Sequence, residues 1–389
     1  MGRSKKRKKI IFSVTDANDI FQFVKEAKFV VKGSLTNLPV LDYIRFIVDG
    51  NKLRLIASNL DLFLTMELQC EEENDQSDFL LLISDLYKIF GGMKGGVVFA
   101  RGLEDYQINL LFDKEKHTLL RGANPDLEYP DFNFFSMEER SVTLPKDNLW
   151  FVQQAMGDNE MRNNMNGLCP VEGYGLVSID GHRLHVVEAE MTEYGKIYPA
   201  SFVNEMARIA KLTKHQISFT CRKADKIRNS DTAYFSVVDH KTVWSLYSRM
   251  IDSTFPEVDR VIPKNSDIKI SLDAKEATRI LSRVKKFCCK RDKDGDRIAP
   301  LVKMKIELSN MFFIANRLDE IVSELEMDIE NLSTVPDSNF MIGANADYMI
   351  DALKKETGKV TFGMNENLDP IKIDRSDGSY AIVMPMRIK

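Results

Sequence analysis

The segment Tyr380-Ala381-Ile382-Val383-Met384-Pro385-Met386-Arg387, close to the end of the 389-residue chain, joins an apolar run to a short Met-Pro-Met segment. The last residues of a chain are usually poorly ordered unless something holds them, and a stretch this apolar is rarely left exposed. We therefore expect this segment to be bound. Two segments further back are as distinctive: Ser178-Ile179-Asp180-Gly181-His182-Arg183-Leu184, and Ser248-Arg249-Met250-Ile251-Asp252-Ser253-Thr254-Phe255-Pro256.

The composition is that of a soluble globular protein, with 44% hydrophobic and 29% charged residues. Apolar stretches fall short of the roughly 18 residues that cross a membrane, and the first residues are basic rather than those of a secretory signal. We expect a cytoplasmic protein. An odd number of cysteines fits neither a disulfide framework nor a zinc site, so we expect buried or inert thiols at Cys70, Cys169, Cys221, Cys288 and Cys289.

The net charge is −4, and six basic residues lie within the first nine positions, so the rest of the chain carries −10. Net charge alone does not indicate nucleic acid, and the distribution of charge has to decide. We expect the basic tail 1–8 to be disordered. It either adds nonspecific attraction to phosphate or serves as a solubilising tail.

One pattern occurs three times: a strand, a short turn, a second strand ending in a polar residue, and an apolar return. It covers residues 46–68, 169–191 and 304–327. Alignment of the three segments makes Asn59, Asp180 and Asn316 equivalent, at separations of 121 and 136 residues. Such spacing is too long for a solenoid repeat and fits whole domains, and 389 residues are many for one core.

A helix-start signal follows each repeat, and alternating patterns after these signals predict further strands. The signals are Ser84-Asp85-Leu86, Pro199-Ala200-Ser201-Phe202 and Asn345-Ala346-Asp347-Tyr348. The predicted fold class is α+β, in three similar domains that each pack two helices on antiparallel sheets. Polar stretches between apolar runs place the domains at 9–138, 139–265 and 266–389.

A helix expected at 274–291 carries one apolar face and one basic stripe. The apolar face consists of Ala277, Ile280, Leu281, Val284, Phe287 and Cys288, and the stripe of Lys275, Arg279, Arg283, Lys286 and Lys290. Neighbouring like charges on a helix repel each other by a few tenths of a kcal/mol per pair. A stripe this uniform is therefore better explained by a polyanionic partner than by a contribution to helix stability.

Similar basic stripes occur elsewhere in the chain. A helix expected at 17–32 has one, formed by Lys25, Lys28 and Lys32. A weaker stripe consists of Arg208, Lys211 and Lys214, and the weakest of Lys354 and Lys355. We expect Gly358 to end the helix that carries the last two. Each stripe alone is most simply a solvated face, but their recurrence in an acidic chain favours DNA. The sequence has no helix-turn-helix, zinc finger or aromatic stacking motif, which points to contact with the DNA backbone rather than to base readout.

The three quoted segments, in this order, closely resemble those of the bacterial DNA sliding clamps, the β subunits of DNA polymerase III, from about residue 9 to 389. The resemblance implies a processivity factor of DNA replication. Two three-domain subunits would close head to tail into a homodimeric ring whose helices surround double-stranded DNA without reading its sequence. The loop Met161-Arg162-Asn163-Asn164 has asparagines where several relatives have a tyrosine pair, and Arg162 in this loop is expected to contact phosphate.

The resemblance further implies a peptide-binding cleft between the second and third domains. The replicative polymerase, the clamp loader and repair proteins would dock there through short Gln-x-x-Leu-Phe-like peptides. The expected cleft residues are Met165, Ile179, Gly181, His182, Arg183, Leu184, Pro256, Arg260, Val261, Asn345, Tyr348, Leu368, Pro370, Ile382, Val383, Met384, Pro385, Met386 and Arg387. Methionine is unbranched and polarizable, which suits a site that adapts to several partners. Ile179, where clamps commonly have threonine, makes the site more apolar.

Three other features of the sequence suggest different functions. Asp180, His182 and His185 lie close together, but side chains three apart on a strand point to opposite faces, so the histidines would not converge on a metal. Residues 292–296 resemble a calcium loop, but Lys303 stands where the closing glutamate belongs. We therefore expect no enzyme, cofactor or metal. The remaining alternative is a non-replicative clamp-like interaction protein that keeps the cleft but does not encircle DNA.

Overall fold

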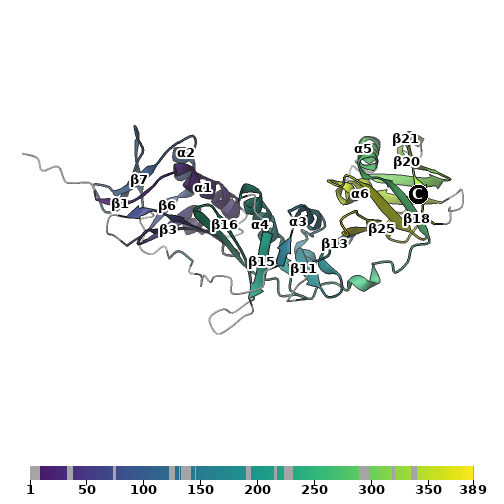
Figure 1. Cartoon of the computed structure of the whole chain (residues 1–389), viewed down its shortest axis with the longest axis horizontal. Coiled ribbons are helices and arrows are strands. Elements are labelled where there is room, and N and C mark those ends of the chain that lie inside the picture. Colours follow the sequence, from purple (N-terminus) through teal and green to yellow (C-terminus); the bar gives the residue numbers. More distant parts are fainter. Residues whose placement is uncertain are drawn as a thin grey trace, which may run out of the picture. The chain divides into compact units, whose positions relative to one another are not determined.

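The computed structural model divides into two compact units, which we describe separately (Figure 1). Unit 1 comprises residues 1–143 and 204–250, and unit 2 comprises 144–203 and 251–389. The structure describes residues 9–32, 38–72, 76–121, 128–130, 132, 142–144, 146–189, 194–213, 217–222, 231–288, 298–317, 320–333 and 340–388. The basic tail 1–8, Lys214, Lys290 and the segment 292–296 lie outside these ranges. The three domain boundaries stay a prediction.

Unit 1 contains two antiparallel sheets. The first has the order β5 (Glu71–Glu72), β1 (Ile10–Val14), β7 (Val97–Arg101), β8 (Gln107–Leu111) and β9 (Lys116–Leu120). The second has the order β10 (Val142–Leu144), β15 (Ile217–Arg222), β16 (Thr232–Asp239), β17 (Thr242–Arg249), β4 (Leu62–Gln69), β3 (Lys52–Ser58), β2 (Tyr43–Asp49) and β6 (Ser77–Leu82). Its helices are α1 (Ala17–Lys32), η1 (Pro39–Asp42), α2 (Ile83–Phe90) and most of α4 (Ala200–Thr213).

Unit 2 also has two sheets. The larger has the order β14 (Tyr198–Pro199), β11 (Gly167–Val171), β12 (Gly175–Ile179), β13 (Arg183–Val187), β26 (Tyr380–Val383), β25 (Ile371–Asp374), β24 (Lys359–Met364), β18 (Ile268–Asp273) and β22 (Glu330–Asn331). The smaller has the order β21 (Glu320–Asp328), β20 (Asn310–Arg317), β19 (Leu301–Glu307) and β23 (Met341–Asn345). Its helices are α3 (Lys146–Gln153), η2 (Glu160–Met165), η3 (Val258–Arg260), α5 (Ala274–Val284), η4 (Lys285–Phe287) and α6 (Ala346–Leu353).

The predicted repeat is confirmed as three antiparallel meanders: β2-β3-β4, β11-β12-β13 and β19-β20-β21. The turn after the second strand is stabilised in the same way in the first two. Asn59 Oδ1 accepts the amide of Leu62 at 2.8 Å, and Asp180 Oδ1 accepts that of Arg183 at 3.0 Å. Asn316 lies instead within β20. Asn and Asp side chains both accept backbone amide hydrogen bonds in turns, which explains why the repeat can be recognised in the sequence at these positions.

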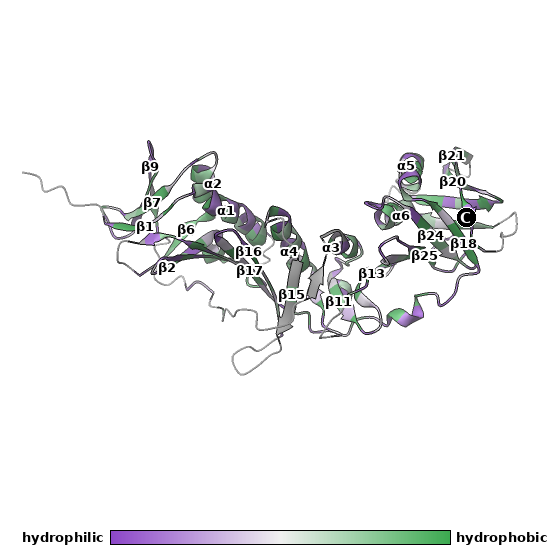
Figure 2. Ribbon diagram, viewed as in Figure 1, coloured by the Kyte–Doolittle hydropathy of each residue, from purple (hydrophilic) through white to green (hydrophobic). Residues whose placement is uncertain are grey.

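The predicted helix at 17–32 is confirmed as α1, which buries Ile20, Phe23, Val24, Ala27 and Val30. Figure 2 shows both hydrophobic and hydrophilic residues along the helices, as expected for elements that cover a sheet on one side. The second and third helix-start signals are confirmed, because α4 begins at Ala200 and α6 at Ala346. At the first signal, α2 begins at Ile83, one residue before Ser84. Asn345 caps α6 by accepting the amide of Asp347 at 2.9 Å.

The helix predicted at 274–291 is shorter than expected. Helix α5 ends at Val284 and continues as the 3-10 turn η4, so the prediction was wrong at residues 285–288, and residues 289–291 lie outside the described ranges. A 3-10 turn winds three residues per turn and rotates the following side chains off the apolar face. Phe287 is accordingly 47% exposed, whereas Cys288 is buried and donates its thiol to the carbonyl of Leu301 at 3.1 Å.

Candidate binding sites

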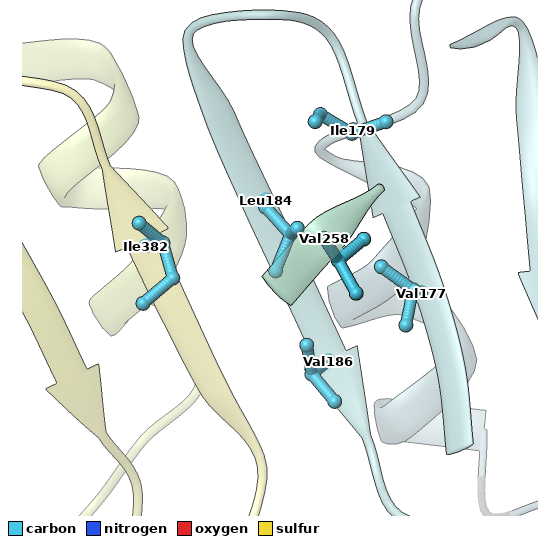
Figure 3. Packing of buried hydrophobic residues seen from close by; sticks show 6 residues of the cluster. All are labelled: Val177, Ile179, Leu184, Val186, Val258 and Ile382. Atoms are coloured by element: carbon cyan, nitrogen blue, oxygen red, sulfur yellow. The ribbon is translucent and has the colours of Figure 1, made fainter. Parts of the chain in front are cut away.

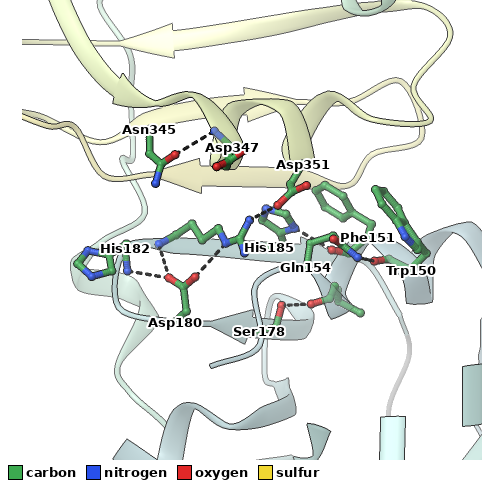
Figure 4. A network of polar contacts seen from close by, with 12 residues as sticks. Trp150, Phe151, Gln154, Ser178, Asp180, His182, His185, Asn345, Asp347 and Asp351 are labelled. Carbon is green, nitrogen blue, oxygen red and sulfur yellow. Dashed lines mark hydrogen bonds and ion pairs between the residues drawn. The ribbon is translucent and has the colours of Figure 1, made fainter. Parts of the chain in front are cut away.

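The turn between β12 and β13 orients the first group of predicted cleft residues in unit 2. Asp180 Oδ1 accepts the amides of His182 at 2.9 Å and Arg183 at 3.0 Å, which closes the turn (Figure 4). Gly181 has φ +90°, a conformation that side chains rarely adopt, and a Cβ there would lie 3.1 Å from Arg162 Nη1. Glycine is therefore required at this turn.

Arg183 joins this turn to helix α6. Its Nε donates to Asp180 Oδ2 at 2.9 Å, its Nη1 donates to Asp351 Oδ2 at 2.6 Å, and its guanidinium lies 4.3 Å from the centre of the Tyr348 ring. The side chain is only 13% exposed, so these charge-assisted bonds are partly shielded from water. The His182 ring lies parallel to that of Tyr348, with ring centres 6.3 Å apart. The structure thus brings three predicted cleft residues together.

A compact apolar cluster lies beside the turn (Figure 3). Its buried members include Ile179, Leu184, Val258 and Ile382, and the half-buried Met165 and Val261 pack against it. Of these six residues, every one but Val258 was predicted to belong to the cleft. Strand β26 pairs with β13 in the register Arg183 to Val383 and Leu184 to Ile382. The cluster therefore combines side chains from distant parts of the sequence.

The Met-Pro-Met segment continues from the end of β26 along the same turn. The amide of Met384 donates to the carbonyl of His182 at 2.9 Å, and the amide of Met386 donates to that of Gly343 at 2.8 Å. Met384, Pro385 and Met386 are half-buried. The segment is therefore held against its own chain, and its side chains stay partly exposed.

The remaining predicted cleft residues surround these groups less closely. Asn345 is buried and caps α6, Pro256 and Pro370 are half-buried, and Arg387 is exposed. Arg260 is exposed and pairs with Glu257 at 2.7 Å. Leu368, which is 56% exposed, precedes β25, the strand that pairs with β26. These residues can extend the contact surface but do not build its core.

The basic side chains predicted to face DNA differ in how far their charge is already balanced. On α1, Lys28 and Lys32 are exposed and Lys25 is half-buried, 4.8 Å from the centre of the Phe21 ring. Arg208 in unit 1 instead pairs with the buried carboxylate of Glu26 at 2.8 Å, and its Nε lies 3.4 Å from the buried carboxyl group of Glu205. Burial and the nearby Glu26 carboxylate raise the pKa of Glu205 to about 8.

In unit 2, Lys275, Arg279, Arg283 and Lys286 are exposed along α5 and η4. Arg279 pairs with Glu276 on the same helix at 2.5 Å.

The prediction that Gly358 ends α6 was wrong, because the helix ends at Leu353. The backbone of Lys354 is extended, and that of Lys355 is left-handed, with a φ of 66°.

Arg162 is exposed, and so is Lys211 on α4 in unit 1. The ammonium groups of Lys354 and Lys355 lie 5.6 and 4.7 Å from the Trp150 ring centre.

No family model matches the chain. Curated relatives named as β sliding clamps match most of it. That of Pseudomonas aeruginosa is 23% identical over 369 residues, covering 90% of this chain and 93% of the relative. That of Salmonella typhimurium is 22% identical over 372 residues, covering 92% and 94%.

Solved structures agree with the sequence matches. The DNA polymerase III subunit β of Pseudomonas aeruginosa gives a TM-score of 0.78 at 20% identity, covering 97% of this chain and all of that one. The Caulobacter crescentus β sliding clamp gives 0.78 at 18% identity, covering 98% and 100%. The fold is that of a β sliding clamp. The resemblance inferred from the sequence and the predicted fold class are thereby confirmed.

Within this clamp fold, the two histidines near the turn do not form a metal site. His182 is exposed, whereas His185 is fully buried, donates from Nδ1 to the carbonyl of Phe151 at 2.8 Å, and stacks on the Phe151 ring at 4.2 Å. In the part of the chain that the structure describes, no three metal-ligating side chains gather, and no helix is long and apolar enough to span a membrane.

The sequence analysis missed two residues that contact members of this group of side chains. Asp351 anchors Arg183. The guanidinium of Arg375 lies 4.4 Å from the centre of the Phe151 ring, and its Nε forms an ion pair with Glu356 at 3.9 Å. A signal for Asp351 existed, since it follows Tyr348 by three positions and therefore shares its face of α6. No local pattern marked Arg375, because Phe151 and Glu356 lie far from it in sequence.

The buried His185 predicts a pH dependence of stability. Burial lowers its pKa to about 3, and the neighbouring Arg183 and Arg375 act in the same direction. An unfolded histidine takes up a proton near pH 6.5 and the folded one does not, so stability is full above pH 6.5 and falls as the pH drops towards 3. Between pH 7 and 5 the loss amounts to about 2 kcal/mol.

The measurement is the free energy of unfolding in urea at pH 7 and pH 5, for the native chain and for His185→Asn. Asparagine keeps a donor towards Phe151 but does not titrate. We expect the native chain to lose about 2 kcal/mol more than the variant over this interval. Equal losses in both proteins would show that His185 is not held neutral by the fold.

Proposed function

We propose that the protein is a DNA sliding clamp, a processivity factor that encircles duplex DNA and tethers the replicative polymerase. The observation that carries this proposal is the match over at least 90% of the chain, in sequence and in structure, to proteins named as β sliding clamps and DNA polymerase III subunits. These names support the replicative clamp over the alternative that only keeps the cleft. They also agree with the prediction that the chain is not an enzyme.

We propose that partners bind at the apolar cluster beside the β12–β13 turn. Two features support a peptide ligand there. Half-buried Met165, Met384 and Met386 offer flexible apolar surface. Arg183 holds the turn against α6, so the surface is formed before the ligand arrives. The replicative polymerase, the clamp loader and repair proteins would dock in turn through their Gln-x-x-Leu-Phe-like peptides.

DNA would be held by loose phosphate attraction rather than by a fixed complex. Exposed Lys28, Lys32, Arg283 and Lys286 supply positive charge on helices of both units, in a chain that is otherwise acidic. Long, exposed side chains of this kind exchange phosphates readily and read no bases. That property suits a protein that must slide. Because its template and partners are intracellular, we also propose a location in the cytoplasm.

Ring closure would join two copies head to tail through unpaired sheet edges. Strand β9 ends one sheet of unit 1, and β21 ends one sheet of unit 2. The charges of the two edges are opposite: β9 carries Lys116 and no acidic residue, whereas β21 carries four acidic residues and no basic one. Both edges expose apolar side chains, with Leu120 63% and Ile321 60% exposed. Such edges invite pairing with another chain.

Replacing Leu120 with Asp should weaken dimerisation by about thirtyfold or more, because a new carboxylate would meet the acidic β21 of the second copy. Analytical ultracentrifugation at micromolar concentration measures the effect. The matched control is Leu308→Asp, a 76% exposed leucine beyond the end of β19. A native chain that is monomeric, or a Leu120→Asp dimer as stable as the control, would contradict this arrangement.

A further inference from the structure

A pocket of about 510 Å³ in unit 1 shares Lys28 and Lys32 with the basic stripe of α1 and is distinct from the apolar cluster of unit 2. It opens between the last turns of α1 and the start of α2, two helices that pack side by side through Phe21 and Tyr87, whose ring centres are 5.6 Å apart. Its volume is within the range of sites for small organic ligands.

The rim of this pocket is basic. Lys28, Lys32 and Lys88 line it, and Asp42 is the acidic residue among its described lining. The Lys28 ammonium is held 4.1 Å from the centre of the Tyr87 ring. Lys88 lies 3.9 Å from Asp85, and both side chains are well exposed, so this ion pair leaves much of the lysine's charge effective. The surplus of positive charge selects an anion.

The walls are apolar. Val31, Leu82 and the ring of Tyr87 line the pocket, so the anion it fits has an apolar part beside its charge. A nucleotide has this chemistry: a flat base that packs on aromatic and aliphatic side chains, next to a phosphate. In a duplex the bases are stacked and paired, and only an unpaired nucleotide can turn its base into a pocket.

We propose that this pocket binds one unpaired nucleotide of single-stranded DNA, with the base against Tyr87 and Val31 and the flanking phosphates near Lys28, Lys32 and Lys88. The proposal rests on the clamp function, since Lys28 and Lys32 belong to the stripe expected to face DNA. It adds a preference that phosphate attraction alone does not give. A clamp with this pocket would pause where single-stranded DNA adjoins the duplex.

The test compares two probes of equal charge, an oligothymidylate octamer and an abasic octamer of the same backbone, by fluorescence anisotropy at about 50 mM salt. An octamer is too short to depend on encirclement, so the result is independent of ring closure. We expect the native chain to bind the thymidylate probe roughly tenfold more tightly than the abasic probe. Tyr87→Ala should remove this difference, and Tyr87→Phe should keep it.

Tyr87 is 37% exposed and packs on Phe21, so Tyr87→Phe is the variant that keeps this helix contact. The matched control is Tyr106→Ala, a 50% exposed tyrosine of unit 1 outside the pocket lining, which should preserve the difference. Lys32→Gln and Lys88→Gln should weaken both probes alike and each lower the salt dependence by about 0.7 in the log–log slope.

The proposal is overturned if the native chain binds both octamers equally or binds neither, or if Tyr87→Ala retains the base preference. None of these results would disturb the clamp function, which depends on retention of long DNA.

Discussion

Replacing both Met384 and Met386 with Ala is expected to weaken binding of a Gln-x-x-Leu-Phe peptide roughly thirtyfold or more, with the protein still folded. Truncating a buried interface anchor typically costs about 2 kcal/mol or more. The substitution leaves the backbone bonds of Met384 to His182 and of Met386 to Gly343 in place, so the segment keeps its position. Deleting the last six residues would remove these bonds as well and is the less selective change. Titration calorimetry with the peptide gives the affinity.

Met161→Ala is the matched control for this experiment. Met161 is 95% exposed and belongs to the same unit, but it lies outside the apolar cluster, so its truncation should leave peptide affinity unchanged. A folded double variant with native affinity would place the peptide site elsewhere on the protein.

The second large effect concerns salt. Binding that depends on ion pairs with six to ten phosphates should weaken by about a thousandfold or more as salt rises from 50 to 200 mM. A closed ring on nicked circular DNA is held by topology, and its half-life should change little over the same range. Replacing Arg279, Arg283 and Lys286 with Glu should reduce the amount loaded. Once loaded, the variant should stay as long as the native protein.

This outcome is measured by gel filtration of loaded circles at both salt concentrations. A native half-life that falls with salt as steeply as ion pairing predicts would identify an ordinary basic-patch binder. Equal loading of the native and charge-reversed proteins would show that the α5 stripe does not contact DNA.

Local patterns in the sequence predicted much of the fold, because their causes are local. Helix α1 follows from apolar spacing, and the turns after β3 and β12 follow from Asn59 and Asp180, whose side chains bond to the backbone a few residues on. The C-terminal strand was recognisable from its apolar run. The end of α5 was not, because the contact of Cys288 with Leu301 that accompanies it is formed across the fold.

The candidate site was predicted unevenly for the same reason. Family resemblance supplied the residues around His182 and Tyr348, which the structure brings together. It supplied neither Asp351 nor Arg375, whose importance depends on side chains far away in sequence. Arg208 shows another limit: its helix position predicted a phosphate contact, but the sequence did not show that its guanidinium pairs with the buried Glu26 carboxylate of unit 1.

The most direct test of the clamp function is the lifetime of loaded protein on a nicked circle before and after one restriction cut. The proposed ring predicts that the protein survives a high-salt wash on the circle and leaves within minutes once the DNA is linear, because sliding off an end breaks no contact. An equal lifetime on circular and linear DNA would contradict encirclement.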